Sequence, residues 1–216
     1  MKTAIIIGAT GLVGNELTKK LLKDDRYSIV KIFVRKSAGI THPKLEEHVV
    51  DFEKLEQWKN KITGDELYSA MGTTIKKAGS KEAQYKIDFT YQYKCAKAAS
   101  ENGVEKYLLV SSAGANKKSG NFYLRMKGEL DEIVSLLPFK RINIFRPSIL
   151  AGERKERRRG EEIGTYAIKF LAQIIPPLKK YRPIEAATVA EAMIRAANQN
   201  NQPNMMIYEL EQIFQI

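Results

Sequence analysis

Cysteine, histidine and long apolar runs are scarce in this chain of 216 residues. The single cysteine, Cys95, cannot form an internal disulfide, and the two histidines, His42 and His48, have no companions at metal-ligand spacing. No apolar run approaches the ~20 residues that cross a bilayer, and the first one is too short for a signal peptide. We therefore expect a cytoplasmic protein with no metal site and no membrane segment.

Acidic side chains are outnumbered by basic ones, and the formal net charge is +11. Such a balance can favour nucleic acid, an anionic membrane surface or a phosphate-bearing ligand. The lysines are scattered along the chain, however, and no aromatic-and-basic platform or nucleic-acid reading motif is present. We expect no nucleic-acid binding. The arginines cluster only in residues 153–162, which either bind an acidic or phosphorylated substrate or form an exposed loop.

Short apolar runs alternate with amphipathic stretches along most of the chain. The expected strands are residues 4–8, 28–35, 46–52, 65–72, 105–112 and 139–147. The expected helices between them are residues 12–25, 53–60, 80–101 and 122–137. This alternation predicts the α/β class, with a doubly wound parallel sheet and right-handed crossovers.

The pattern loosens after Pro147, where we expect helices at residues 161–173 and 188–198 and a short strand at 205–210. No repeat, low-complexity tract or linker interrupts the chain. We therefore expect one domain over residues 1–216, in which about 148–216 contributes a small lobe that covers the substrate, at the carboxyl ends of the strands.

The stretch "GATGLVG" places Gly8, Gly11 and Gly14 between an expected strand and an expected helix. In this context the first glycine allows a sharp turn, the second lets the backbone approach a pyrophosphate, and the third allows close packing of helix on strand. The N-terminus of the helix then offers free N–H groups to the phosphates. The motif predicts a dinucleotide-binding Rossmann fold.

The end of the second expected strand carries Arg35 and Lys36, where NAD-preferring sites have an acidic residue. Two cations suit a 2′-phosphate, although they could also simply face solvent. We therefore expect NADP(H) in preference to NAD(H). By their position, Asp51 and Phe52 would lie near the adenine, and Gly72 and Thr73 beside the second ribose and the pyrophosphate.

The stretch "SSAGANKKSGNFYLRMK" joins a serine pair to a Tyr-x-x-x-Lys pattern at Tyr123 and Lys127. The same spacing recurs at Tyr27/Lys31 and at Tyr93/Lys97, so the pattern alone says little. Only Tyr123 follows a strand that ends in serine, and it lies one helical turn before Lys127 on the same face.

This combination suits hydride transfer to a carbonyl, which leaves negative charge on the oxygen. A tyrosine can donate the proton when a neighbouring ammonium lowers its pKa from about 10, and a serine hydroxyl can hold the substrate oxygen. Ser111 and Ser112 are both candidates. Because adjacent strand residues point to opposite faces, only one of them should face the site.

Taken together, these motifs and "FRPSIL" make the chain resemble the short-chain dehydrogenase/reductase superfamily, and in particular its atypical branch of Tat-interacting-protein and NmrA-like proteins. The resemblance implies catalytic roles for Ser111, Tyr123 and Lys127. It also implies a cofactor shell made of Gly8, Thr10, Gly11, Leu12, Val13, Gly14, Arg35 and Gly72, with Pro147 and Ile149 bordering the nicotinamide.

The chain departs from the family pattern in one helix. Typical members carry an asparagine there that helps to relay protons, and the corresponding stretch "YKIDFTYQY" has none. The resemblance implies an NADP(H)-dependent oxidoreductase acting on a small carbonyl or alcohol. The alternative is a non-catalytic, NADP(H)-sensing module that binds a protein partner, and a homodimer is also open. A sugar-nucleotide epimerase would need a larger substrate lobe.

Overall fold

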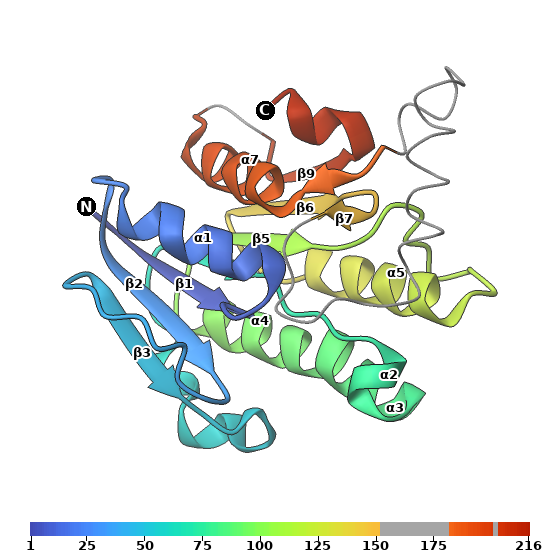
Figure 1. Ribbon diagram of the computed structural model, residues 1–216, viewed down its shortest axis with the longest axis horizontal. Helices are drawn as coiled ribbons and strands as arrows, with labels where there is room; N and C mark the ends of the chain where they lie inside the picture. The colour runs from blue at the N-terminus through green and yellow to red at the C-terminus, as the bar shows by residue number, and fades with distance from the viewer. Residues whose placement is uncertain (152–181, 201–202) are drawn as a thin grey trace.

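The computed structural model describes residues 1–151, 182–200 and 203–216. Seven strands form one sheet in the order β3-β2-β1-β4-β5-β6-β9, and every neighbouring pair is parallel (Figure 1). The strands are β1 (Lys2–Ile7), β2 (Tyr27–Val34), β3 (Leu45–Val49), β4 (Glu66–Ser69), β5 (Lys106–Val110), β6 (Arg141–Arg146) and β9 (Met205–Glu209). The predicted α/β class and doubly wound parallel sheet are confirmed.

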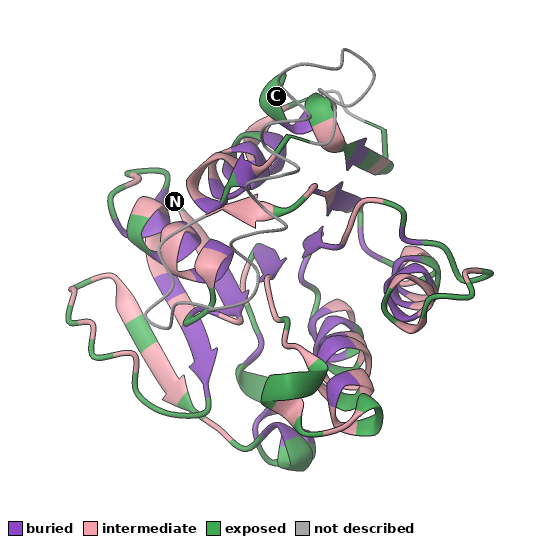
Figure 2. Ribbon diagram, turned by 45° about the vertical axis from the view of Figure 1, so that its right-hand side comes forward, coloured by how far each residue is buried: buried purple, intermediate pink, exposed green. Residues whose placement is uncertain are grey.

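The sheet is covered by helices on both faces, because its central strands are apolar on both sides. On β1, Ala4 and Ile6 pack into one core cluster, with α1 (Leu12–Leu22) and α7 (Ala186–Asn198), whereas Ile5 and Ile7 pack into the other. The second cluster includes residues of α4 (Gln92–Glu101) and α5 (Phe122–Ser135). The central strands are accordingly buried along most of their length (Figure 2).

Short elements connect these layers and correct some expected boundaries. The third strand ends at Val49 rather than residue 52, because Asp51 caps a 3-10 helix by accepting a hydrogen bond from the N–H of Glu53. The expected helix 80–101 is divided by a π-helical segment, η3. The connecting elements are η1 (Phe52–Gln57), η2 (Lys59–Lys61), α2 (Ile75–Ala78), α3 (Lys81–Tyr85) and η3 (Lys86–Tyr91).

The C-terminal part of the chain contributes to the sheet as well as to its surroundings. Strand β9 pairs with β6, α7 packs beside α1, and a two-stranded sheet joins β7 (Leu150–Ala151) to β8 (Ile184–Glu185). The chain ends in the 3-10 helix η5 (Leu210–Phe214). The expected helix 161–173 and the arginine cluster 153–162 lie outside the described residues, so the substrate lobe stays a prediction. None of the described helices has the length and apolar character needed to cross a membrane.

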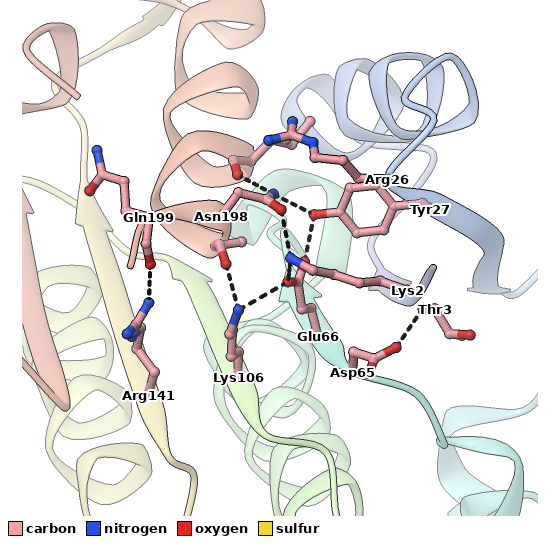
Figure 3. Close-up of polar contacts among 12 residues, drawn as sticks. Lys2, Thr3, Arg26, Tyr27, Asp65, Glu66, Lys106, Arg141, Asn198 and Gln199 are labelled. Atoms are coloured by element: carbon pink, nitrogen blue, oxygen red, sulfur yellow. Dashed lines mark hydrogen bonds and ion pairs between the residues drawn. The ribbon is translucent and has the colours of Figure 1, made fainter. Parts of the chain in front are cut away.

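A buried carboxylate joins the amino ends of four strands (Figure 3). The Glu66 side chain on β4 is fully buried and accepts hydrogen bonds from the Tyr27 hydroxyl at 2.6 Å and the Tyr68 hydroxyl at 2.8 Å. It also pairs with Lys2 of β1 at 2.8 Å and with Lys106 of β5 at 3.4 Å. Asn198, at the end of α7, donates to the Tyr27 hydroxyl at 2.8 Å. Burial, followed by the Glu66 charge, raises the pKa of Tyr27 above its usual range, so that its hydroxyl remains a donor.

Replacing Glu66 with alanine should strongly destabilise the fold. The change leaves Lys2 and two buried hydroxyls without their acceptor, and breaking a buried ion pair costs about 3–5 kcal/mol. The free energy of unfolding, measured by urea titration, should fall by that amount. Asp65→Ala is the control, since this exposed neighbour only accepts one bond from the N–H of Thr3, and should cost about 1 kcal/mol. Equal losses would contradict the account.

Candidate active site

The glycine loop after β1 is closed so tightly that two of its positions exclude any side chain. Gly8 has a φ of +83°, and a Cβ there would lie 2.5 Å from the carbonyl carbon of Ala70. A Cβ on Gly14 would lie 2.0 Å from the carbonyl oxygen of Gly8. The N–H of Gly11 donates to that same oxygen at 2.9 Å. The loop therefore starts α1 directly at the carboxyl end of β1.

Helix α1 begins with Gly11 at its N-cap, so no side chain covers the first turn. An uncapped N-terminus presents N–H groups and the positive end of the helix dipole, which together bind phosphate. Gly11 also packs closely inside the loop, since a Cβ there would lie 3.2 Å from the Gly8 oxygen.

A large open cleft lies at the carboxyl ends of the strands, between the loops that follow β1, β4, β5 and β6. Most of the predicted site residues line this one cleft. They are Thr10, Gly11, Leu12, Val13, Gly72, Thr73, Ser111, Ser112, Tyr123, Lys127, Pro147 and Ile149.

Six predicted residues do not line the cleft. Gly8 and Gly14 act beneath it, through the close packing described above. Arg35 and Lys36 follow β2 and are exposed, whereas Asp51 caps η1. Phe52 is buried against the rings of Trp58 and Tyr91, so it belongs to the core. The roles of all the predicted site residues stay predictions, and the last four of these residues also lie outside the cleft lining.

Strand alternation separates the two serines. Tyr107 and Leu109 pack in the cluster that contains α4 and α5, whereas Leu108 and Val110 pack in the cluster of α1 and α7. The same alternation places Ser111 on the α5 side. Its side chain is 4% exposed and its hydroxyl has no hydrogen-bond partner among the described residues. Ser111 is therefore the serine that shares a face with the tyrosine helix.

Helix α5 carries both the tyrosine and the lysine into the cleft. Asn121 caps the helix by accepting a bond from the N–H of Leu124 at 3.1 Å. In the next turn, Tyr123 is 36% exposed, and Lys127 is buried with its ammonium 3.5 Å from the carbonyl oxygen of Val110. The other two Tyr-x-x-x-Lys pairs lie elsewhere, since Tyr27 is in the Glu66 cluster and Tyr93 stacks near Phe89.

Two residues that the sequence analysis passed over help to build this wall of the cleft. A Cβ on Gly128 would lie 2.3 Å from the backbone nitrogen of Lys117, so this glycine lets α5 approach the loop after β5. A glycine inside an amphipathic helix was the available signal. The other residue is Asp88, which is buried and lines the cleft from η3. The available signal was an acidic residue on an otherwise apolar face of the expected helix.

Comparison with known proteins agrees with this geometry. The family described as NAD(P)H-binding matches residues 8–136. The chain belongs to this family. Protein FMP52-1, mitochondrial, of Scheffersomyces stipitis is 33% identical over 99% of this chain and 98% of its own length. Protein HTATIP2 of Rattus norvegicus is 32% identical over 89% of this chain and 80% of its own. The resemblance to the atypical short-chain dehydrogenase/reductase branch is thereby confirmed.

Solved structures show the same fold at low sequence identity. The Bordetella bronchiseptica enzyme WbmH, in complex with NAD+, superposes with a TM-score of 0.72 at 15% identity, covering 97% of this chain and 75% of that one. The UDP-glucose 4-epimerase of Thermus thermophilus, in complex with NAD, gives a TM-score of 0.69 at 14% identity, covering 99% and 81%. At such identities the likeness concerns the fold alone.

The relatives overturn the expected cytoplasmic location. Several fungal proteins that match the chain, including those of Scheffersomyces stipitis, Emericella nidulans and Candida glabrata, are named mitochondrial. The prediction was wrong because it rested on missing features, and a missing signal peptide or apolar span does not distinguish the cytoplasm from an organelle.

No cluster of three or more metal-ligating side chains occurs in residues 1–151, 182–200 and 203–216.

Gly14→Ala should disrupt the glycine loop. The added Cβ meets a backbone oxygen at 2.0 Å, and such a contact is relieved only by moving α1 away from β1. We expect a loss of about 1–3 kcal/mol in the free energy of unfolding, together with weakened NADPH binding. Gly120→Ala is the control, because nothing lies within 4 Å of a Cβ at that position. A Gly14→Ala protein that melts and binds NADPH like the control would refute the close-packing argument.

Proposed function

We propose that the chain is an NADP(H)-dependent oxidoreductase that moves a hydride between the nicotinamide and a small carbonyl or alcohol. The observation that carries the proposal is the gathering of Ser111, Tyr123 and Lys127 in the cleft that the glycine loop opens. The glycine loop and the stretch from Ser111 to Lys127 are far apart in the sequence, so their meeting in one cleft is a property of the fold.

The residues present suit a dinucleotide along the whole cleft. The glycine loop and the first turn of α1 would hold the pyrophosphate. Gly72 and Thr73 would lie beside the nicotinamide ribose, and Pro147 with Ile149 would border the ring. When bound, the nicotinamide supplies or accepts the hydride.

The chain's own side chains would manage the proton and the charge. In reduction, the Tyr123 hydroxyl would donate its proton to the substrate oxygen as hydride arrives at the carbon; in oxidation, it would take the proton back. The unpartnered Ser111 hydroxyl would hold the same oxygen. The Lys127 ammonium would stabilise negative charge on the tyrosine and hydrogen-bond the ribose.

Tyr123→Phe should lower turnover by at least about 100-fold, the usual contribution of a general acid or base. NADPH affinity should change little, because the lost hydroxyl contacts the substrate. The assay is a panel of small carbonyls followed by NADPH absorbance, and Tyr93→Phe, from the same spacing on α4, is the control. Full activity in Tyr123→Phe would refute the mechanism. NADPH binding without turnover on any carbonyl would favour a sensing module.

Replacing Arg35 and Lys36 together with alanine should weaken NADPH binding far more than NADH binding. Both cations follow β2 and are exposed, and in the proposed complex they would bind the 2′-phosphate that NADH lacks. Calorimetric titration with both nucleotides measures the difference. Lys94→Ala with Lys97→Ala, two exposed cations on α4, controls for the change in net charge. Equal losses for the two nucleotides would contradict the NADP(H) preference.

A further inference from the structure

The surroundings of Lys127 contain three buried polar atoms that have no hydrogen-bond partner among the described residues. They are Asp88 Oδ2, Ser111 Oγ and Asp131 Oδ1. The three side chains are no more than 4% exposed, and Lys127 itself is 3% exposed. Buried polar atoms in folded proteins are nearly always paired. The Ser111 hydroxyl and the Asp131 carboxyl act on each other, so the atom that most needs a physical explanation is Asp88 Oδ2.

Asp88 lies on the π-helical segment η3, which packs against α5, and it lines the same cleft as Lys127. Its Oδ1 accepts a hydrogen bond from the N–H of Thr73 at 2.8 Å, and Gln84 donates to the Thr73 carbonyl at 3.1 Å. Burial raises the pKa of Asp88, and the nearby charge that opposes this rise is Lys127. One carboxylate oxygen is thus committed to the loop after β4, and the other is free for the ammonium.

Asp131 lies one helical turn after Lys127, on the same face of α5. Its Oδ2 accepts a hydrogen bond from Arg146 Nε at 2.9 Å, and Arg146 also pairs with Glu209. Burial raises the pKa of Asp131, while Ser111, Arg146 and Lys127 oppose the rise; the Tyr107 hydroxyl is the other titratable group near it. One oxygen is thus committed to Arg146, and the Ser111 hydroxyl interacts with the same carboxyl group.

The Lys127 ammonium needs these carboxylates. Within the described residues it donates one hydrogen bond, to the Val110 carbonyl, and the distance of 3.5 Å is longer than a normal bond. A buried charge without compensation is costly, and opposite charges nearby reduce the cost. No described carboxylate lies within ion-pair distance of Lys127, and the buried carboxylates on which its charge acts are those of Asp88 and Asp131.

We propose that Asp88 and Asp131 are positioning residues, two buried carboxylates that hold the Lys127 ammonium between them and so set its place beside Tyr123. The proposal rests on the oxidoreductase function proposed above. Asp88 also connects this ammonium to the loop of Gly72 and Thr73, so the cofactor wall and the proton-donating helix share one anchor.

The first test uses Asp88→Asn and Asp131→Asn, which keep an oxygen acceptor for Thr73 and Arg146 but remove the charge. Each should lower kcat about 10-fold, because a misplaced ammonium weakens the proton transfer, with KM and NADPH affinity nearly unchanged. The pH–rate profile should also change, because removing a buried carboxylate alters the electrostatic field at Tyr123 and Lys127. Glu129→Gln, the same change on α5 at a residue that bonds Tyr85, should move neither.

The second test needs no turnover and so separates this inference from the proposed function. Lys127→Met and Asp88→Asn, combined, should lower the melting temperature by less than the sum of the single changes, since each removes the charge that the other compensates. The same should hold with Asp131→Asn, whereas Glu129→Gln should be additive. If Lys127→Met alone does not fold, the Asp→Asn changes should restore folding.

The two tests give distinguishable failures. Wild-type kcat and pH profile in both Asp→Asn variants, or additive melting temperatures, would overturn the positioning role and leave the oxidoreductase function standing. An inactive wild-type protein with non-additive melting temperatures would retain the charge arrangement and overturn the proposed function. Asp88→Ala, which also loses the Thr73 bond, should weaken NADPH binding where Asp88→Asn does not.

Discussion

The contact between Gly14 and the carbonyl oxygen of Gly8 is the constraint on which the site depends. Only the missing Cβ lets α1 begin directly over the end of β1. That placement aims the start of the helix into the cleft and leaves room for a pyrophosphate. If α1 lay farther from β1, its N-terminus could not bind the pyrophosphate, and no nucleotide would be held beside Tyr123 on α5.

Buried charged groups are paired differently at the amino ends and at the carboxyl ends of the strands. At the amino ends, Glu66 of β4 accepts hydrogen bonds from β1, β2, β4 and β5, and Asn198 connects this cluster to α7. At the carboxyl ends, Asp88, Asp131 and Ser111 each keep a buried atom unpaired beside Lys127. A fully hydrogen-bonded buried group stabilises a fold, whereas a buried group without a partner can bind a ligand or take part in a reaction. The paired carboxylate and the proposed catalytic groups thus lie at opposite ends of the same sheet.

The sheet, its helices and the glycine loop were predictable because apolar runs and a glycine motif are local patterns. The choice of Ser111 over Ser112 was not, since it depends on which core each face of β5 meets. The sequence analysis did not identify Asp88, Asp131 and Gly128 for the same reason, because their roles come from packing between different segments of the chain. The π-helical segment, which carries Asp88, has the periodicity of an ordinary helix in the sequence. The predicted cytoplasmic location was wrong for a different reason, because it rested only on features that the sequence lacks.

The central claim is that a nicotinamide ring meets Tyr123 and Lys127 in the cleft above β1. A crystal structure of the protein with NADP+ tests it most directly. We expect the pyrophosphate against the first turn of α1 and the ring beside Tyr123, with the lysine ammonium on the ribose. A nucleotide bound elsewhere, or one whose ring lies far from the tyrosine hydroxyl, would contradict the account.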